Sequence, residues 1–343
     1  MIGIALLGAG RMGQVHADAI AQADARIVCV FDQVTEVAQR LGDATGAKVI
    51  GTAEDAINHP DVDAVMVVTS SDTHTKLILK AHQAGKAVFC EKPLSNSLED
   101  AQNCIDALGD DGSKRVFLGF NRRFDKHHGA LCARVKSGEI GTLEQLIITS
   151  RDPYPPPLEY IPKSGGLFSD MMIHDFDMAR SILTEEPVSI VANGSSVVDP
   201  EIGTLGDVDS ATVIMRTASG VLVIIVNSRR CAFGYDQRIE AFGSQGMLIS
   251  NNVPKTSVTL ANGDSHDGKD ALPEFFMDRY AESYVAEIET FLDCVRSGKD
   301  MPVNAIDGLR AMMLANAATQ SNLTGEVVEI AMNELMIKAR LLS

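Results

Sequence analysis

Three groups of residues in this chain could together carry out a hydride transfer. The first is the glycine-rich loop Gly8-Ala9-Gly10-Arg11-Met12-Gly13, whose spacing is typical of loops that hold a dinucleotide pyrophosphate. The second is Lys92, in the run CEKPL, which can hold an oxygen that develops negative charge. The third is Asp170 with His174 four residues later, and a histidine can take a proton near neutral pH. Their order and spacing together favour a dehydrogenase.

The elements around the glycine loop support a dinucleotide site. Residues 2–7 form an apolar run typical of a buried parallel strand, residues 15–23 continue as a helix, and residues 26–31 form a second strand that ends at Asp32. Asp32 follows Gly13 by 19 residues, the distance at which an acidic side chain meets the adenosine ribose. A carboxylate repels a 2′-phosphate, so Asp32 favours NAD over NADP. The alternative is a glycine turn in an ordinary βα unit.

The same alternation of strand and helix continues to residue 120. Strands are predicted at residues 62–69, 87–90 and 115–120, with a helix at 73–84. Ligands of doubly wound sheets bind beyond the carboxyl ends of the strands, so the residues at those ends should converge. His74 is interpreted equally well as a cofactor contact or as a solvated helix residue. The residues predicted to bind the cofactor are Gly8, Gly10, Arg11, Met12, Gly13, Asp32, Thr69, Ser70, His74, Glu91 and Lys92.

After residue 120 the pattern changes to strands joined by short turns. We expect strands at residues 143–150, 188–192, 209–217, 221–228, 235–242 and 247–250, which is typical of an antiparallel α+β domain. The prediction is therefore an N-terminal Rossmann domain at residues 1–120 and a second domain at residues 121–343. Residues 221–226 are apolar at every position, so both faces of that strand should be covered. A second subunit could cover one face, which predicts a homo-oligomer.

The most informative segment of the second half is a predicted helix over residues 167–183. Apolar residues nearly surround it, except for Asp170, His174 and Asp177, which would share an arc of roughly 60°. A histidine satisfied by the aspartate one turn earlier is one interpretation, and metal ligation by the same pair is another. No third ligand is evident, so no metal is predicted. Because of the glycine loop and Lys92, we favour a catalytic role for the pair.

Composition excludes several other classes of function. The net charge of −16 argues against nucleic-acid binding, because that affinity depends on neutralising phosphates. No apolar run is long enough to span a bilayer, and the first residues lead directly into a strand, so we expect a cytoplasmic protein without a membrane partner. The six cysteines show no CxxC spacing and are expected to be unpaired thiols.

The motifs GAGRMG, CEKPL, GFNRRFD and SGGLFSDMMIHDFDMAR resemble those of the Gfo/Idh/MocA oxidoreductases along nearly the whole chain. Within that family, SRDP at residues 150–153, the proline-rich loop after it and Gly234-Tyr235-Asp236 resemble the inositol dehydrogenases. The resemblance implies a Rossmann domain followed by a large open, mainly antiparallel sheet, through which family members often form tetramers. It also implies catalytic roles for Lys92, Asp170 and His174. The residues it implies for substrate binding are Lys92, Asn121, Arg122, Asp152, Asp170, His174 and Tyr235.

The activity implied by this resemblance is NAD-dependent oxidation of a ring hydroxyl of myo-inositol to the ketone scyllo-inosose. His174 would act as the base, Lys92 would hold the reacting oxygen, and Asp170 would orient either of them and anchor another hydroxyl. A dehydrogenase of another polyol or sugar is the nearest alternative. An NAD-dependent glycosidase and a non-catalytic NAD-sensing regulator are further alternatives, and the regulator is disfavoured because it has no need for the three catalytic residues together.

Overall fold

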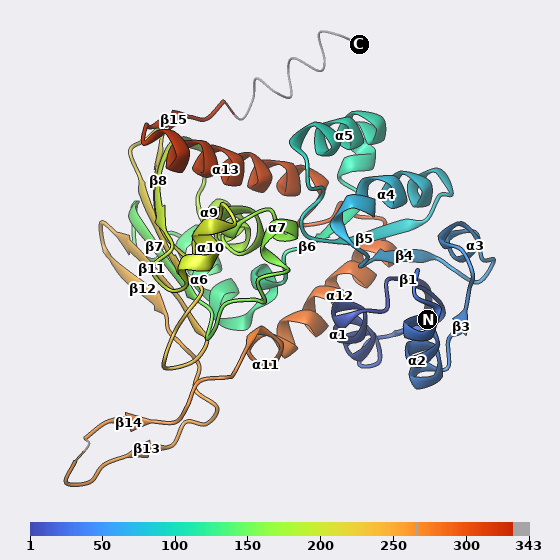
Figure 1. Cartoon of the computed structure of the whole chain (residues 1–343), viewed down its shortest axis with the longest axis horizontal. Coiled ribbons are helices and arrows are strands. Elements are labelled where there is room, and N and C mark those ends of the chain that lie inside the picture. Colours follow the sequence, from blue (N-terminus) through green and yellow to red (C-terminus); the bar gives the residue numbers. More distant parts are fainter. Residues whose placement is uncertain (265, 332–343) are drawn as a thin grey trace. The chain divides into compact units, whose positions relative to one another are not determined.

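A computed structural model describes residues 1–264 and 266–331, so the last part of the predicted second domain lies outside the described residues. The chain divides into two compact units (Figure 1). The first unit contains Met1–Phe124 and Glu282–Met312, and the second contains Asp125–Ala281 and the described residues from Met313 onward. Residues 282–312 were expected in the second domain, whereas their contacts place them with the first 124 residues.

The first unit is built on a six-stranded parallel sheet in the order β3-β2-β1-β4-β5-β6. Its central strands are buried along their whole length, as continuous apolar runs require. The order changes direction between β1 and β4, which is the arrangement of a Rossmann fold. The elements up to Phe124 are β1 (Ile2–Leu7), α1 (Arg11–Ile20), β2 (Ala25–Phe31), α2 (Thr35–Thr45), β3 (Lys48–Val49), α3 (Ala53–Ile57), β4 (Ala64–Val67), the 3-10 helix η1 (Ser71–Thr73), α4 (His74–Gln83), β5 (Ala87–Glu91), α5 (Leu98–Ser113), β6 (Val116–Gly119) and the 3-10 helix η2 (Asn121–Phe124).

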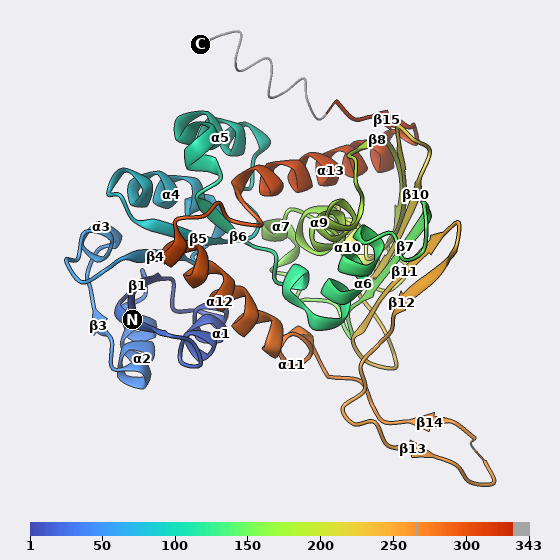
Figure 2. The same ribbon diagram turned by 180° about the vertical axis from the view of Figure 1, so that it is seen from behind.

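A helix from late in the chain completes this unit. The ring of Phe291, in α12 (Ala281–Ser297), packs edge-on against Phe89 of β5 at 5.7 Å and against Phe117 of β6 at 5.8 Å between ring centroids. Both views show α12, in orange, beside the helix that follows the glycine loop (Figures 1 and 2). The apolar side of α12 therefore forms part of the core of the first unit.

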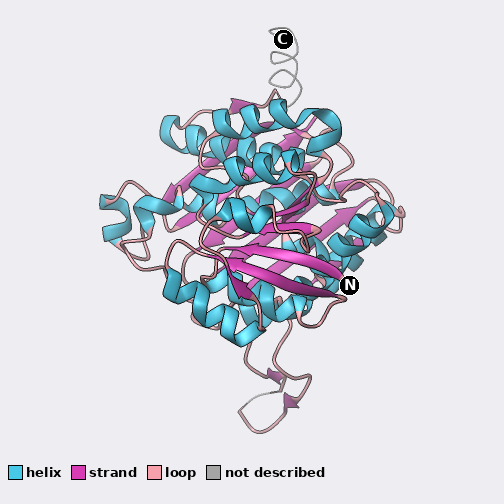
Figure 3. Cartoon of the chain, turned by 90° about the vertical axis from the view of Figure 1, so that its right-hand side faces the viewer, coloured by secondary structure: helices cyan, strands magenta, loops and turns pink. Residues whose placement is uncertain are grey.

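The second unit is built on a seven-stranded sheet in the order β12-β11-β7-β10-β9-β8-β15. The pair β7 and β10 is parallel and the other pairs are antiparallel, which confirms the predicted mainly antiparallel sheet. Strands and helices can be told apart by colour in Figure 3. The remaining elements are α6 (Lys126–Lys136), β7 (Leu143–Arg151), α7 (Ile161–Ser164), α8 (Leu167–Asp170), α9 (Ile173–Ile182), β8 (Pro187–Ser195), α10 (Pro200–Thr204), β9 (Ser210–Thr217), β10 (Leu222–Ser228), β11 (Asp236–Gly243), β12 (Gly246–Ser250), β13 (Thr259–Leu260), β14 (Gly268–Lys269), α11 (Phe276–Arg279), α13 (Ala305–Thr324) and β15 (Val328–Glu329).

The two faces of this sheet differ in their surroundings. Helices α6 and α9 lie on one face, whereas no helix of the described chain covers the other face (Figures 1 and 2). Accordingly, β9 and β10 alternate between buried side chains and more exposed ones. Strand β10, whose residues 222–226 are all apolar, therefore has only one face covered by the described part of this chain. Strands β13 and β14 form a separate two-stranded sheet in an arm that leaves the sheet after β12.

Candidate active site

The glycine loop has the geometry that a bound pyrophosphate needs. Gly8 has φ of +103°, and a Cβ there would lie 2.5 Å from the carbonyl oxygen of Val68. A Cβ at Gly13 would lie 2.3 Å from the carbonyl oxygen of Gly8, so both positions require glycine. At Gly10, directly before α1, a Cβ would meet nothing within 4 Å. Gly8 and Gly13 therefore shape the loop, while Gly10 leaves the helix amino terminus open to a phosphate.

Asp32 lies beside this loop at the end of β2. Its Oδ2 accepts the backbone N–H of Ala9 at 2.7 Å and its Oδ1 accepts that of Val34 at 2.9 Å. The side chain is half-buried, and each carboxylate oxygen keeps a lone pair for a further donor. The arrangement fits a carboxylate that is held in place and can accept hydrogen bonds from ribose hydroxyls.

His74 connects the ends of two neighbouring strands, β4 and β5. Its Nδ1 lies 2.8 Å from the carbonyl oxygen of Pro93, and its Nε2 lies 3.1 Å from that of Thr69. The residue is only 1% exposed, so the interpretation as a solvated helix residue is wrong. Burial lowers the pKa of this imidazole, and the two carbonyl contacts oppose that effect only in part. His74 thus fixes the turn that follows Lys92.

Glu91 holds Lys92 from the other side. Its Oε1 lies 2.7 Å from Nε2 of His16, in the helix that follows the glycine loop, and its Oε2 accepts the backbone N–H of Lys92 at 3.0 Å. His16 is fully buried. The contact between His16 and Glu91 joins α1 to the turn that contains Lys92. This connection was not predicted from the sequence. The prediction that Glu91 binds the cofactor stays a prediction.

In the second unit, the predicted single helix over residues 167–183 is wrong, because it is divided into α8 and α9. The N–H of Met172 bonds to the oxygen of Leu167, five residues back, whereas the N–H of His174 bonds to that of Met171, three residues back. These bonds interrupt the regular i→i−4 ladder between the two helices. Asp170 therefore ends α8, and His174 lies in the first turn of α9.

The Asp170 carboxylate is held by two other side chains. Its Oδ1 accepts the Tyr160 hydroxyl at 3.0 Å, and its Oδ2 lies 3.5 Å from the guanidinium of Arg229. The side chain is 19% exposed, so a substrate hydroxyl can still reach it. Neither Tyr160 nor Arg229 was among the predicted site residues, although Tyr160 lies in the proline-rich loop that contributes to the family resemblance.

Helix α9 is itself anchored to the sheet by Asp175, the residue after His174. Its carboxylate is fully buried and accepts the Ser150 hydroxyl at 2.6 Å and the Asn227 amide at 2.8 Å. Asp177, which was predicted on the same polar stripe as His174, is also buried. No local pattern could identify the partners of Asp175, because they come from strands distant along the chain.

The strand register brings two further predicted residues, Asp152 and Tyr235, to the same end of the second sheet as Arg229. Arg151 of β7 is paired with Asp236 of β11 and with Ser228 of β10. Asp152, Tyr235 and Arg229 are adjacent to these three residues along the chain. They therefore lie close together at this end of the sheet. Tyr235 is buried and Asp152 is half-buried.

The remaining predicted residues lie in the first unit. Asn121 and Arg122 are both buried in η2, directly after β6. Arg11 is exposed and Met12 half-buried in the first turn of α1, and Ser70 is exposed after β4. The structure thus groups the predicted residues into two sets, one in each unit.

No metal centre is found in the described part of the chain, since no group of three His, Cys, Asp or Glu residues could hold an ion there. All six cysteine thiols are free, as predicted, and burial raises the pKa of Cys104 to about 12, which keeps this thiol protonated. Within residues 1–264 and 266–331 there is also no helix long and apolar enough to cross a membrane.

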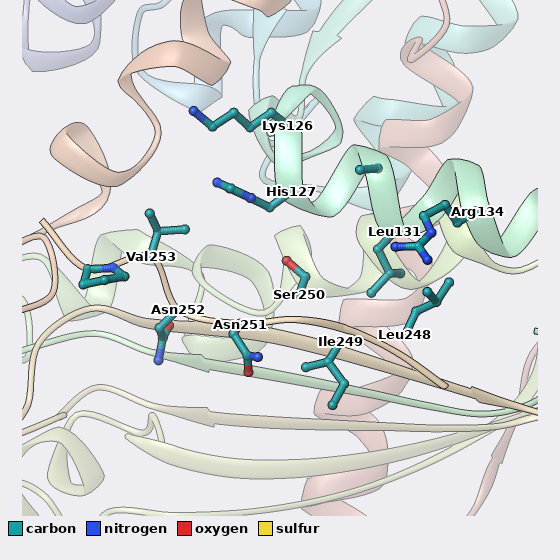
Figure 4. Close-up of a pocket in the computed structure, with 12 residues that line it drawn as sticks. Lys126, His127, Leu131, Arg134, Leu248, Ile249, Ser250, Asn251, Asn252 and Val253 are labelled. Atoms are coloured by element: carbon teal, nitrogen blue, oxygen red, sulfur yellow. The ribbon is translucent and has the colours of Figure 1, made fainter. Parts of the chain in front are cut away.

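A pocket of about 410 Å³ lies elsewhere in the second unit, between α6 and the segment that follows β12 (Figure 4). Lys126, His127 and Arg134 of α6 line one side of it, and residues 248–254 line the other. It contains none of the predicted site residues.

Comparison with known proteins identifies both halves of the chain. A family model described as an oxidoreductase family with an NAD-binding Rossmann fold matches residues 2–120, and the GFO/IDH/MocA C-terminal domain matches residues 128–249. The inositol 2-dehydrogenase of Rhizobium meliloti is 46% identical over 328 residues, covering 95% of this chain and 98% of that protein. The myo-inositol 2-dehydrogenase of Thermotoga maritima is 44% identical, covering 93% of this chain and 95% of that protein.

Solved structures agree with these matches. A myo-inositol dehydrogenase from Corynebacterium glutamicum superposes with a TM-score of 0.93 at 43% identity, covering 96% of this chain and 99% of that one. A myo-inositol dehydrogenase from Lactobacillus casei, in complex with NAD(H) and myo-inositol, superposes with a TM-score of 0.85 at 26% identity, covering 96% of this chain and 97% of that one.

Proposed function

The chain belongs to the Gfo/Idh/MocA family of oxidoreductases, and from this we propose that it is an NAD-dependent inositol 2-dehydrogenase that oxidises myo-inositol to scyllo-inosose. The observation that carries this proposal is the similarity to inositol 2-dehydrogenases over nearly the full length of both chains. The first unit is an NAD-binding Rossmann domain. The reaction therefore belongs to the oxidoreductases that act on a CH–OH group.

The residues of the first unit fit NAD. The open backbone at Gly10 leaves room for the pyrophosphate at the start of α1, and Asp32 is placed to accept the ribose hydroxyls. A nicotinamide bound there would supply the acceptor for a hydride from the substrate carbon. The protein must position that carbon and remove the hydroxyl proton.

We assign the proton to His174, because a neutral imidazole is a suitable base near neutral pH. As the C–H bond breaks with its electron pair, the O–H bond gives its proton to His174, and the carbon becomes a ketone. The Lys92 ammonium hydrogen-bonds the same oxygen and stabilises its negative charge while the proton leaves. Asp170 accepts a hydrogen bond from a second ring hydroxyl.

Several residues are proposed to bind the remaining ring hydroxyls. Polyol recognition needs side chains that both donate and accept hydrogen bonds, and a site built to bond each hydroxyl rejects analogues that lack one. The proposed residues besides the catalytic three are Asn121, Arg122, Asp152 and Tyr235.

The experiment that tests the proposed function is a substrate panel with both cofactors. NADH formation from myo-inositol, scyllo-inositol and common aldoses is measured at 340 nm with NAD and with NADP. We expect the highest kcat/KM with myo-inositol and NAD. A higher kcat/KM with scyllo-inositol or an aldose would mean that this compound, and not myo-inositol, is the substrate. Release of a leaving group from a glycoside without net NADH formation would identify a glycosidase instead.

We also propose that the chain forms a homo-oligomer, a tetramer or dimer, through the outer face of the second sheet. Ile224 of β10 lies in register with Ile147 of β7 and with Ile214 of β9, which forms an apolar row on that face. Ile214 is 43% exposed, and apolar exposure of this extent in a row is typical of an interface.

The cytoplasmic location expected from the sequence also stays a proposal, which cell fractionation tests.

A further inference from the structure

Arg229 is the largest of the fully buried side chains and lies next to the carboxylate assigned to substrate binding. It directly follows β10, and its backbone N–H bonds to the carbonyl oxygen of Asp209 at 2.7 Å. Its guanidinium extends between two carboxylates, 3.5 Å from Oδ2 of Asp170 and 3.4 Å from Oδ2 of Asp207. One buried cation therefore faces two anions.

The contacts of Arg229 are poor for a residue whose only task is stability. Both ion pairs are at the long end of hydrogen-bond distance, and Nε has no hydrogen-bond partner among the described residues. A buried ion pair with incomplete hydrogen bonding contributes little net stability, because desolvation offsets the attraction. The incomplete hydrogen bonding of this buried guanidinium therefore needs an explanation other than stability, and a functional role is one such explanation.

Asp207 is the fixed member of this cluster. Its Oδ1 accepts the backbone N–H of Val208 at 2.8 Å and that of Leu167, the first residue of α8, at 2.9 Å. Asp207 is thereby held by the backbone and in turn anchors Arg229. The same two residues thus contact both ends of α8, with Asp207 at Leu167 and Arg229 at Asp170.

Asp170 is the member that remains accessible. The Tyr160 hydroxyl occupies Oδ1 and Arg229 lies at Oδ2, which together restrict the rotation of the carboxylate. Because α8 is only four residues long and ends at Asp170, the helix alone cannot fix this side chain. A substrate-binding group must be held within about 0.5 Å of its productive position.

We propose that Arg229 is a positioning residue that acts through Asp170: anchored by Asp207, it holds the Asp170 carboxylate in the orientation that binds a substrate hydroxyl. This inference rests on the proposed function, because it assigns Asp170 to the polyol. Arg229 itself does not touch the substrate in this proposal.

The test is a double-mutant cycle with Arg229→Met and Asp170→Asn. Both kcat/KM for NADH formation and the Kd for myo-inositol with NADH bound are measured, so variants with slow turnover still give a value. In the wild-type background we expect Arg229→Met to lower kcat/KM by about 10- to 100-fold, the loss expected for a charged hydrogen bond. In the Asp170→Asn background the same change should cost less than about threefold.

Three further measurements separate positioning from general destabilisation. Arg229→Lys keeps the charge and should recover part of the lost activity. Arg238→Met removes a guanidinium from another ion pair, 2.7 Å from Asp236 on β11, and should leave kcat/KM near the wild-type value. NADH affinity should be unchanged in every variant.

An equal loss in both backgrounds would show that Arg229 acts on the fold as a whole, and a loss below threefold in the wild-type background would show that it has no role; either result overturns the inference. A wild-type protein that turns over none of the polyols and binds none of them contradicts the proposed function instead.

Discussion

The carboxylate of Asp32 accepts the backbone N–H of Ala9 at 2.7 Å, across the 23 residues that separate them. The bond connects the end of β2 to the glycine loop that follows β1. The backbone N–H of Gly8, in the same loop, also donates a hydrogen bond to the carbonyl oxygen of Phe31 at 2.8 Å. Asp32 thus shapes the loop as well as facing the proposed ribose position.

This double role gives a prediction for Asp32→Ala. Losing one charged hydrogen bond to the ribose costs about 1.5–3 kcal/mol, so we expect the Kd for NAD to rise by roughly 10- to 100-fold. Removal of the carboxylate also removes repulsion of a 2′-phosphate, so the ratio of NADP affinity to NAD affinity should increase. Calorimetric titration with NAD and with NADP measures these values. Asp18→Ala, at an exposed position on α1, is the control, and an unchanged cofactor ratio in Asp32→Ala contradicts the ribose assignment.

The proposed base is tested by His174→Ala. General base catalysis typically contributes 10²- to 10⁴-fold, so kcat should fall by about that factor while NADH affinity stays within about twofold. Steady-state kinetics and NADH titration give the two values. His127→Ala is a matched control, because this half-buried histidine lies in the same unit at the pocket of Figure 4. Activity of His174→Ala within a few-fold of the wild type would mean that another group takes the proton.

The strands could be predicted from the sequence more accurately than the helices of the site. Residues 143–150 and 209–217 were predicted as strands, and β7 and β9 begin and end within one residue of those bounds. Their apolar pattern is local, so it can be recognised without knowing the partner strands. The break between α8 and α9 could not be predicted, since the segment is apolar on nearly every side and contains no proline or glycine after Gly166.

Side-chain partners distant in sequence were likewise not predictable. His16 and Glu91 are 75 residues apart, and Asp170 and Arg229 are 59 apart. The return of residues 282–312 to the first unit depends on aromatic contacts such as that between Phe291 and Phe117. A single sequence carries no pattern that identifies such pairs. The spacing of the glycine loop and Asp32, in contrast, placed both at the carboxyl ends of strands, and in the structure they lie in contact.

The proposed oligomer is tested by Ile224→Asp on the outer face of the second sheet. Because Ile224 is in the middle of the row with Ile147 and Ile214, a charge there should be costly if a second subunit covers it. Sedimentation analysis at micromolar concentration should show an oligomer for the wild type and mainly monomer for the variant. The control is Val197→Asp, at a position that is 69% exposed and outside the strands. A monomeric wild type under these conditions rules out the proposed assembly.

A pH effect on stability is predicted from Asp125 and Arg279 in the second unit. Burial alone would raise the pKa of the Asp125 carboxyl, but the Arg279 guanidinium, with Nη1 2.6 Å from Oδ2, holds that pKa at about 2, below its usual value of 3.8. A folded-state pKa below the unfolded one stabilises the protein above the unfolded pKa, and this stability is lost as the pH falls from about 4 towards 2. The difference corresponds to about 2 kcal/mol at neutral pH.

Urea unfolding of the wild type and Asp125→Asn should therefore show a gap in the free energy of unfolding that is constant from about pH 7 to 5 and narrows below about pH 4. The Asp18→Asn variant, at an exposed carboxylate, should show a small gap at every pH. A gap for Asp125→Asn that does not change with pH would mean that the variant is destabilised by packing and that the ion pair contributes no net free energy.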